Sequence, residues 1–279
     1  MKKSIFKLSS YKLIFVVLVG LCICFFLCND NDFRMKKSDK GVYQKKIFEA
    51  SNGNLNYRIF YPENFDASKK HPLLLFMHGA GERGNDNEAQ LIHGSQLVAD
   101  GMNKYNAIAI FPQCPTEDYW VKFKGEDVDS NGERNFNIDV NNGPSEALGK
   151  VIELVSEMKA KNYIDKTRIY VAGLSMGGMA TFDLLWRMPN TFAAAMPICG
   201  AGAPEKADKM KSVPIRIFHG EEDEVVPIQN SRDMQDALTA EGASPETFYY
   251  PGVNHDSWIN AFAEKDFLSW LFDQKRVEI

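Results

Sequence analysis

The sequence has no excess of positive charge, no internal repeat and no low-complexity segment. Its 279 residues carry 32 Lys and Arg against 37 Asp and Glu, which gives a formal net charge of −5. Nucleic-acid binding requires clustered Lys and Arg side chains that contact phosphates, so this composition argues against a nucleic-acid partner. Hydrophobic residues make up 44% of the chain, as is ordinary for a globular protein, and the length suits one sizeable domain.

Cysteine is also scarce, because only Cys114 and Cys199 lie beyond the N-terminal segment out of five in total. They lack the paired spacing of a zinc site. No cofactor is predicted for the chain. Both follow apolar, strand-like runs and are expected at the same edge of a sheet. The sequence leaves two alternatives open: a disulfide, which export would permit, or two free buried thiols.

The N-terminus differs from the rest of the chain. Four lysines precede an uncharged apolar run over residues 13–28, and mostly polar residues follow it. A basic flank before a short apolar run is typical of an export signal, and the run is somewhat shorter than the ~20 residues of a membrane-spanning helix. We predict a signal peptide, a lipoprotein signal or an N-terminal anchor in residues 1–28, and a linker in residues 29–41. Membrane attachment is expected only through this segment of an exported protein.

Short apolar runs alternate with helical patterns over residues 42–279, which are predicted to form one folded domain. Strands are expected at residues 42–50, 55–61, 72–77, 107–111, 168–172, 192–198, 214–218 and 247–250. Helices are expected at residues 145–158, 177–187, 229–241 and 258–274. The first two strands flank Asn52-Gly53, a strong hairpin signal. The alternation predicts an α/β fold with a mostly parallel sheet of about eight strands and helices on both faces. The polar segment 116–142 is predicted to be a long loop that shapes the substrate cleft.

The main chemical signal is Gly173-Leu174-Ser175-Met176-Gly177, which joins an apolar run to a helical pattern. In a sharp strand-to-helix bend, side chains two residues before and after the serine would collide, so both positions are glycine. The bend would present the Ser175 hydroxyl above the sheet at the positive end of a helix. A glycine and serine turn without chemistry is the alternative.

A nucleophilic serine needs a base within hydrogen-bonding reach and a carboxylate behind that base. In a strand–bend–helix hydrolase, the order along the chain is serine, acid, histidine. His255 lies in a short loop before the last predicted helix, whereas His219 ends a strand-like run and is expected to be structural. Asp223 is preferred as the acid because apolar residues follow it closely. Glu222 and Asp256 are its rivals.

Two backbone N–H groups are expected to bind the oxyanion of an acyl transfer. One belongs to Met176, directly after the serine, and the other to Ala80, with Gly81 close behind, in the His78-Gly79-Ala80-Gly81 loop. The same loop also matches Gly-x-Gly-x-x-Gly, the dinucleotide fingerprint. It does not follow the first strand of a βαβ unit, and polar residues occupy the place of the expected helix, so we reject that interpretation.

Six motifs in order carry a family resemblance. They are HGAGERGNDNEAQ (78–90), FPQCP (111–115), GLSMGG (173–178), PICGAG (197–202), HGEEDEVVP (219–227) and HDSW (255–258). Together they resemble the peptidase/esterase branch of the α/β-hydrolase superfamily, which is related to feruloyl and acetylxylan esterases and to the phospholipase/carboxylesterase group. The resemblance covers the chain from about residue 59 to the C-terminus.

The resemblance implies a metal-free serine carboxylic-ester hydrolase with an acyl-enzyme and a triad of Ser175, Asp223 and His255. It also suggests feruloyl or acetyl esters of plant polysaccharide as substrates. A serine peptidase or acylaminopeptidase with the same triad, and a non-catalytic carbohydrate-binding protein on a hydrolase scaffold, are the alternatives. Gly81 and Trp120 are expected to line the substrate site, with core packing as the other interpretation of Trp120. Trp258 is expected to pack beneath the His255 loop.

Overall fold

The computed structural model describes residues 41–128 and 134–277. The predicted signal or anchor, residues 1–28, and all of the predicted linker except residue 41 lie outside the described residues. Within the described residues, no helix combines the length and the apolar character that crossing a bilayer requires.

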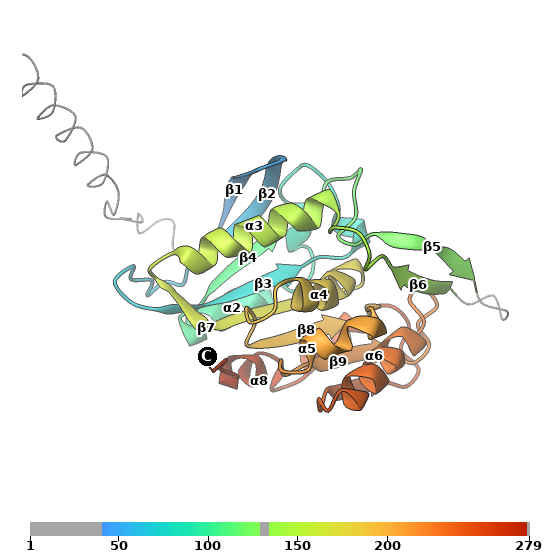
Figure 1. Cartoon of the computed structure of the whole chain (residues 1–279). Coiled ribbons are helices and arrows are strands. Elements are labelled where there is room, and N and C mark those ends of the chain that lie inside the picture. Colours follow the sequence, from blue (N-terminus) through green and yellow to red (C-terminus); the bar gives the residue numbers. More distant parts are fainter. Residues whose placement is uncertain (1–40, 129–133, 278–279) are drawn as a thin grey trace, which may run out of the picture. The chain divides into compact units, whose positions relative to one another are not determined.

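One large sheet organises the described chain, and six of its eight strands run parallel (Figure 1). Its strands are β1 (Tyr43–Ala50), β2 (Gly53–Phe60), β3 (His71–Met77), β4 (Ile108–Pro112), β7 (Ile164–Leu174), β8 (Ala194–Ile198), β9 (Arg216–Gly220) and β10 (Glu246–Tyr250). Their order across the sheet is β1-β2-β4-β3-β7-β8-β9-β10. This arrangement confirms the predicted mostly parallel sheet of about eight strands.

The first two strands form the predicted hairpin, with Ala50 opposite Gly53, and β2 runs antiparallel to β4. Gly53 has a φ of +117°, a conformation that glycine adopts without steric cost. In the middle of the sheet, β3, β4, β8 and β9 are buried along their whole length. Strands covered on both faces are expected to be continuously apolar, which explains why these runs were recognisable in the sequence.

Helices cover both faces of the sheet. They are α2 (Ser95–Tyr105), α3 (Glu146–Ala160), α4 (Met176–Arg187), α5 (Ala207–Met210), α6 (Gln229–Ala240), α7 (Trp258–Ala263) and α8 (Phe267–Asp273). Leu74 and Phe76 of β3 pack in one core cluster with side chains of α2 and α8. Alternate strand residues face the opposite side, where α3 and α4 lie in front of the sheet in Figure 1.

Several elements differ from the sequence predictions, and α5 is a further helix that was not predicted. The segment 116–142 is not a continuous loop, because β5 (Phe123–Val128) and β6 (Arg134–Ile138) pair as an antiparallel ribbon within it. The helix α2 was not predicted. The predicted helix over 258–274 is broken at Glu264, whose backbone is extended between α7 and α8. This break lets Phe267, Leu268 and Leu271 of α8 face the core.

Candidate active site

The bend after β7 holds Ser175 in a strained backbone conformation, with φ +54° and ψ −121°. Its N–H donates to the Ile198 carbonyl at 2.8 Å, which ties the bend to the end of β8. A Cβ atom on Gly173 would lie 2.4 Å from the Gly177 carbonyl oxygen, and one on Gly177 would lie 2.0 Å from the Met77 carbonyl oxygen. These distances show that steric crowding requires glycine at both positions, as predicted.

The loop after β10 brings His255 to this serine. Nε2 of His255 lies 2.9 Å from Ser175 Oγ, although the two residues are 80 positions apart in sequence. The Trp258 ring packs edge-on against the imidazole with ring centroids 5.7 Å apart, which confirms the predicted support from this side chain. The parallel strands β7 and β10 end at the same edge of the sheet, so residues directly after them are able to meet.

The loop after β9 supplies a buried carboxylate. Asp223 Oδ2 lies 2.8 Å from His255 Nδ1, while Oδ1 accepts the N–H groups of Val225 at 2.9 Å and Val226 at 2.8 Å. The rivals Glu222 and Asp256 are exposed, and neither makes this contact. The structure therefore favours Asp223 among the three candidates.

Hydrogen bonding keeps the Asp223 carboxyl ionised despite its burial. Burial alone would raise its pKa, but hydrogen bonds from His219, His255 and the Val226 N–H more than offset burial and hold the pKa well below its usual range. An ionised carboxylate only accepts hydrogen bonds, so Nδ1 of His255 must carry a proton. In the neutral ring, Nε2 is then free to accept the Ser175 hydroxyl proton.

His219 is held in structure at the end of β9, as predicted. Its side chain is fully buried, with Nδ1 at 2.7 Å from Ser231 Oγ and Nε2 at 2.8 Å from the Val226 carbonyl oxygen. Nε2 also lies 3.1 Å from Asp223 Oδ2, a contact that the sequence did not indicate.

The loop after β3 lies directly against the nucleophile. A Cβ atom on Gly79 would come within 2.9 Å of the Leu174 side chain and 3.5 Å of Ser175 Cβ. Ala80 begins a short 3₁₀ helix, Ala80–Glu82, and Met176 is the first residue of α4. The N–H groups of first helical residues have no carbonyl partner within their helix, so both predicted donors are of the type that binds an oxyanion.

Gly81 borders open space, because a Cβ atom built on it meets nothing within 4 Å. The residue is exposed on the same loop as Ala80. The loop does not lead into the long helix of a dinucleotide-binding unit: the short 3₁₀ helix follows Gly79, and the Gly84 N–H donates to the Cys114 carbonyl at 2.9 Å.

Trp120 corrects the expectation of a substrate-lining side chain. It is fully buried, and its indole N–H donates to the His78 carbonyl at 3.1 Å. A buried indole needs a partner for its N–H, and the backbone at the end of β3 provides one. Trp120 therefore packs in the core and supports the loop that carries Gly79 and Ala80.

His78 connects this loop to the chain after β4. Its Nδ1–H donates to the Gly79 carbonyl at 2.6 Å, while Nε2 accepts the Cys114 N–H at 3.0 Å. Both ring nitrogens are thus satisfied in the neutral state. Burial and the nearby Arg83 lower the pKa of His78 to about 4, against the opposing effect of its bond to Gly79.

Cys114 and Cys199 are buried free thiols, so the structure decides against the disulfide alternative. The Cys199 sulfur and one ligand atom each of Asp223 and His255 lie within 4.8 Å of one another. Burial raises the pKa of both thiols. The absence of a metal remains a prediction.

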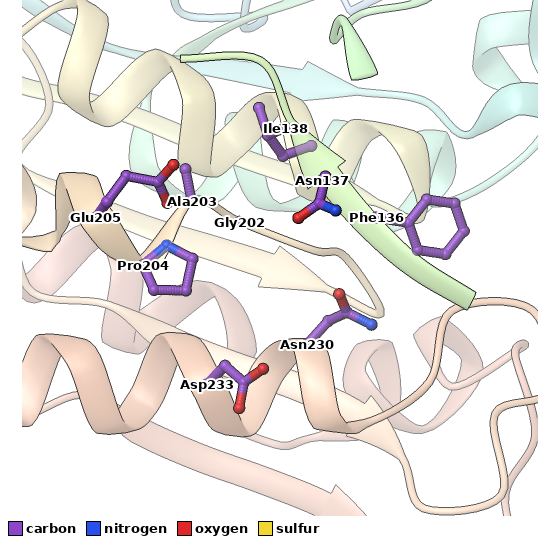
Figure 2. A pocket seen from close by; sticks show the side chains of 9 residues that line it. All are labelled: Phe136, Asn137, Ile138, Gly202, Ala203, Pro204, Glu205, Asn230 and Asp233. Atoms are coloured by element: carbon purple, nitrogen blue, oxygen red, sulfur yellow. The ribbon is translucent and has the colours of Figure 1, made fainter. Parts of the chain in front are cut away.

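A polar pocket of about 180 Å³ lies between β6, the loop after β8 and the start of α6 (Figure 2). It is lined by Phe136, Asn137, Ile138, Gly202, Ala203, Pro204, Glu205, Asn230 and Asp233, among which there is neither Lys nor Arg. Figure 2 shows Asn230 and Asp233 on one side and the β6 residues across from them. Gly202 is three residues beyond Cys199, so their Cα atoms are at most about 11 Å apart. None of Ser175, Asp223 and His255 lines the pocket, which shares the loop after β8 with Cys199.

The fold and this serine, histidine and aspartate arrangement define an α/β-hydrolase. The family model of phospholipases and carboxylesterases matches residues 64–270, and the chain belongs to this family. A solved thermostable esterase is 32% identical with a TM-score of 0.71, covering 84% of this chain and 63% of that one.

Two curated relatives agree with this placement. Poly(3-hydroxyalkanoate) depolymerase C of Paucimonas lemoignei is 31% identical over 176 residues, which are 61% of this chain and 37% of the relative. A bifunctional acetylxylan esterase/xylanase of Neocallimastix patriciarum is 34% identical over 79 residues, 28% of this chain and 12% of the relative. The chain thus spans well under half the length of either.

Proposed function

We propose that this chain is a serine carboxylic-ester hydrolase that acts through Ser175, His255 and Asp223. The observation that carries the proposal is a continuous hydrogen-bonded line from hydroxyl to imidazole to carboxylate, with distances of 2.9 Å and 2.8 Å. Nucleophile and base within 2.6–3.2 Å, with the base oriented by a third group, are the geometry of an activated nucleophile. Family membership supports the same chemistry.

The first half of the reaction forms an acyl-enzyme. His255 Nε2 takes the Ser175 hydroxyl proton as Oγ attacks the ester carbonyl, and the N–H groups of Met176 and Ala80 bind the oxyanion. Asp223 stabilises the imidazolium. When the tetrahedral intermediate collapses, the bond to the alcohol oxygen breaks and His255 gives its proton to the leaving alcohol.

The second half releases the acyl group by the same route in reverse. His255 takes a proton from water, whose oxygen attacks the acyl carbonyl, and the same N–H groups bind the new oxyanion. Ser175 Oγ then leaves with the proton from His255. The products are an alcohol and a carboxylic acid, and the enzyme returns to its starting state.

We propose that the substrates are acetyl or feruloyl esters of polyhydroxylated compounds such as plant polysaccharides. The polar pocket supports this choice: the carboxylates of Glu205 and Asp233 and the amide oxygen of Asn230 can accept from sugar hydroxyls, while Asn230 Nδ2 donates to the Pro227 carbonyl at 2.9 Å. Phe136 adds an apolar face for a sugar ring. Without Lys or Arg in its lining, the pocket is poorly suited to an anionic alcohol. Gly81, which borders open space beside Ala80, is proposed to line the substrate site.

We also propose that residues 42–279 form the catalytic domain of an exported protein. The basic and apolar pattern of residues 1–28 supports a signal peptide, lipoprotein signal or N-terminal anchor. Signal cleavage is tested by N-terminal sequencing of the protein recovered outside the cytoplasm. A full-length cytoplasmic product would contradict export.

Ser175→Ala is the direct test of the enzymatic proposal. Turnover of an activated ester should fall by about 10⁶-fold, because no other group takes the place of the nucleophile. A fluorophosphonate should label the wild-type protein once and leave the variant unlabelled. Undiminished turnover in the variant would refute the triad, and an unlabelled wild-type protein would favour the non-catalytic carbohydrate-binding alternative.

A substrate panel tests the sugar-ester proposal. Acetylated xylo-oligosaccharide, feruloyl arabinose, ethyl acetate and a peptidyl anilide are compared by kcat/KM, and the two sugar esters should be preferred. Asn230→Ala should raise KM for the sugar esters by up to about tenfold, the value of one neutral hydrogen bond, and leave ethyl acetate unchanged. Asn162→Ala, an exposed asparagine outside the pocket, is the matched control. A preference for the anilide would favour a peptidase.

A further inference from the structure

Three short contacts surround the imidazole of His219, the fully buried last but one residue of β9. Nδ1 faces Ser231 Oγ at 2.7 Å, while Nε2 faces both the Val226 carbonyl oxygen at 2.8 Å and Asp223 Oδ2 at 3.1 Å. Ser231 is itself fully buried and lies in the first turn of α6. The ring therefore joins β9, the Asp223 loop and α6.

These partners determine which way the His219 hydrogen bonds run. A carbonyl oxygen and an ionised carboxylate can only accept, so Nε2 must carry a proton whatever the state of Nδ1. In the neutral ring, Nδ1 accepts a hydrogen bond from the Ser231 hydroxyl. In the charged ring, Nδ1 donates to Ser231 Oγ, which can turn its proton toward the Gly200 carbonyl at 3.4 Å. Either way, the single Nε2–H is shared between the Val226 carbonyl at 2.8 Å and the Asp223 carboxylate at 3.1 Å.

Asp223 consequently receives a donor on every side of its carboxylate. Oδ2 accepts from His255 Nδ1 at 2.8 Å and from His219 Nε2 at 3.1 Å, while Oδ1 accepts the N–H groups of Val225 and Val226. The two backbone donors hold one oxygen. His219 is the buried side chain that constrains the other oxygen, the one that orients His255.

We propose that His219, fixed by Ser231, is a positioning residue of the hydrolytic site. It holds the Asp223 carboxylate in the plane that aligns His255 with Ser175, and it touches neither the nucleophile nor its base. The inference rests on the proposed triad. It requires that losing the His219 N–H impair the chemical step rather than substrate binding.

The test compares His219→Leu, which removes the N–H, with His219→Gln, whose amide N–H₂ replaces the donor at the position of Nε2. His219→Leu should lower kcat on an activated ester by about 10²-fold with KM changed less than about twofold, as expected when reacting groups are misplaced by ~1 Å. His219→Gln should recover most of that loss. The fluorophosphonate labelling rate of Ser175 should follow kcat in both variants.

His71→Leu is the matched control, because His71 is equally buried and uses both ring nitrogens, toward Asn106 and Asp66, at the opposite edge of the sheet. It should lower the melting temperature and leave kcat unchanged. If His219→Leu does not fold, Ser231→Ala tests the positioning role instead. This variant removes the hydroxyl that holds the His219 ring, and kcat should fall by about tenfold.

The possible results distinguish a failure of the proposed function from a failure of the positioning role of His219. A wild-type protein that hydrolyses no ester, or a fully active Ser175→Ala variant, would refute the proposed function itself. A wild-type protein that is active, together with a folded His219→Leu or Ser231→Ala variant of undiminished kcat, would refute the positioning role alone. A loss of kcat that His219→Gln does not recover would also overturn it, since the donated hydrogen bond would then be irrelevant.

Discussion

Strand β9 and the loop after β10 place two histidines on one carboxylate, and the two rings have opposite surroundings. The His255 side chain is 19% exposed and its second nitrogen reaches the Ser175 hydroxyl. The His219 side chain is fully buried and its second nitrogen reaches Ser231. Contact with Asp223 therefore does not distinguish a base from a positioning residue. What distinguishes them is access of the other ring nitrogen to the nucleophile and to solvent.

His255→Ala should have the largest effect on activity. Turnover of an activated ester should fall by up to about 10⁶-fold, because the loss of the base alone costs nearly as much as the loss of the whole triad. The side chain is partly exposed, so the free energy of unfolding should change little. Steady-state kinetics and chemical denaturation measure the two quantities. A variant within tenfold of wild-type turnover would contradict the role of His255.

Asp223→Asn should rank second, with turnover reduced by about 10⁴-fold. The amide can donate to His255 Nδ1, which favours the tautomer that carries its proton on Nε2 and cannot accept the Ser175 proton. Stability should also fall, because His219 loses a charged acceptor in a buried position. Steady-state kinetics measures the loss of turnover, and thermal denaturation measures the loss of stability. Unchanged stability with lost turnover would show that His219 does not depend on the carboxylate.

A third histidine, His78, extends the comparison to stability. Its pKa is lowered from 6.5 to about 4 in the folded protein, so between these values the unfolded chain binds a proton that the folded chain does not. The neutral His78 ring therefore makes its full contribution to stability above pH 6.5. As the pH falls to 4, the free energy of unfolding decreases by up to about 3 kcal/mol. Urea denaturation across this range measures the slope.

The control for this effect is His78→Gln, which keeps a donor and an acceptor near the same places and has no ring to protonate. The difference in unfolding free energy between wild type and variant should shrink as the pH falls through this window. A constant difference from pH 7 to pH 4 would mean that His78 is not kept neutral in the folded state.

Glu222→Gln should have the smallest effect. Glu222 is adjacent to Asp223 but is exposed and makes no contact with His255, so kcat/KM should stay within about twofold of wild type, as for an ordinary surface substitution. The assay is the same as for Asp223→Asn, which makes the two neighbouring acids a matched pair. A loss comparable to that of Asp223→Asn would reassign the acid.

Much of the fold was predictable because its signals are local. The buried parallel strands are continuous apolar runs, and the hairpin carries Asn52-Gly53. The bend at Ser175 could be predicted from five consecutive residues. A side chain at position 173 or 177 would collide with backbone atoms in the bend or at the end of β3, so both positions are glycine. His255 could be chosen among five histidines from its place in chain order.

The features that were missed depend on partners distant in sequence. The Trp120 indole N–H donates to the carbonyl of His78, 42 residues earlier in the sequence. The residues next to Trp120 therefore did not indicate that its side chain is buried. The ribbon of β5 and β6 arises in a polar segment without strong strand periodicity. His219 and Asp223 are only four residues apart in sequence, but their contact requires the chain to turn back after β9.

The sequence by itself determined the alternation of strands and helices, the sharp serine bend and the chain order of the three proposed triad residues. The first two follow from neighbouring residues, and the third can be read directly along the chain. Only the tertiary structure decided which acid faces His255, that Trp120 belongs to the core, that both thiols stay free, and that a second histidine shares the carboxylate. The physical reason is that burial and hydrogen-bond partners are set by segments that meet only when parallel strands bring their carboxyl ends to one edge of the sheet.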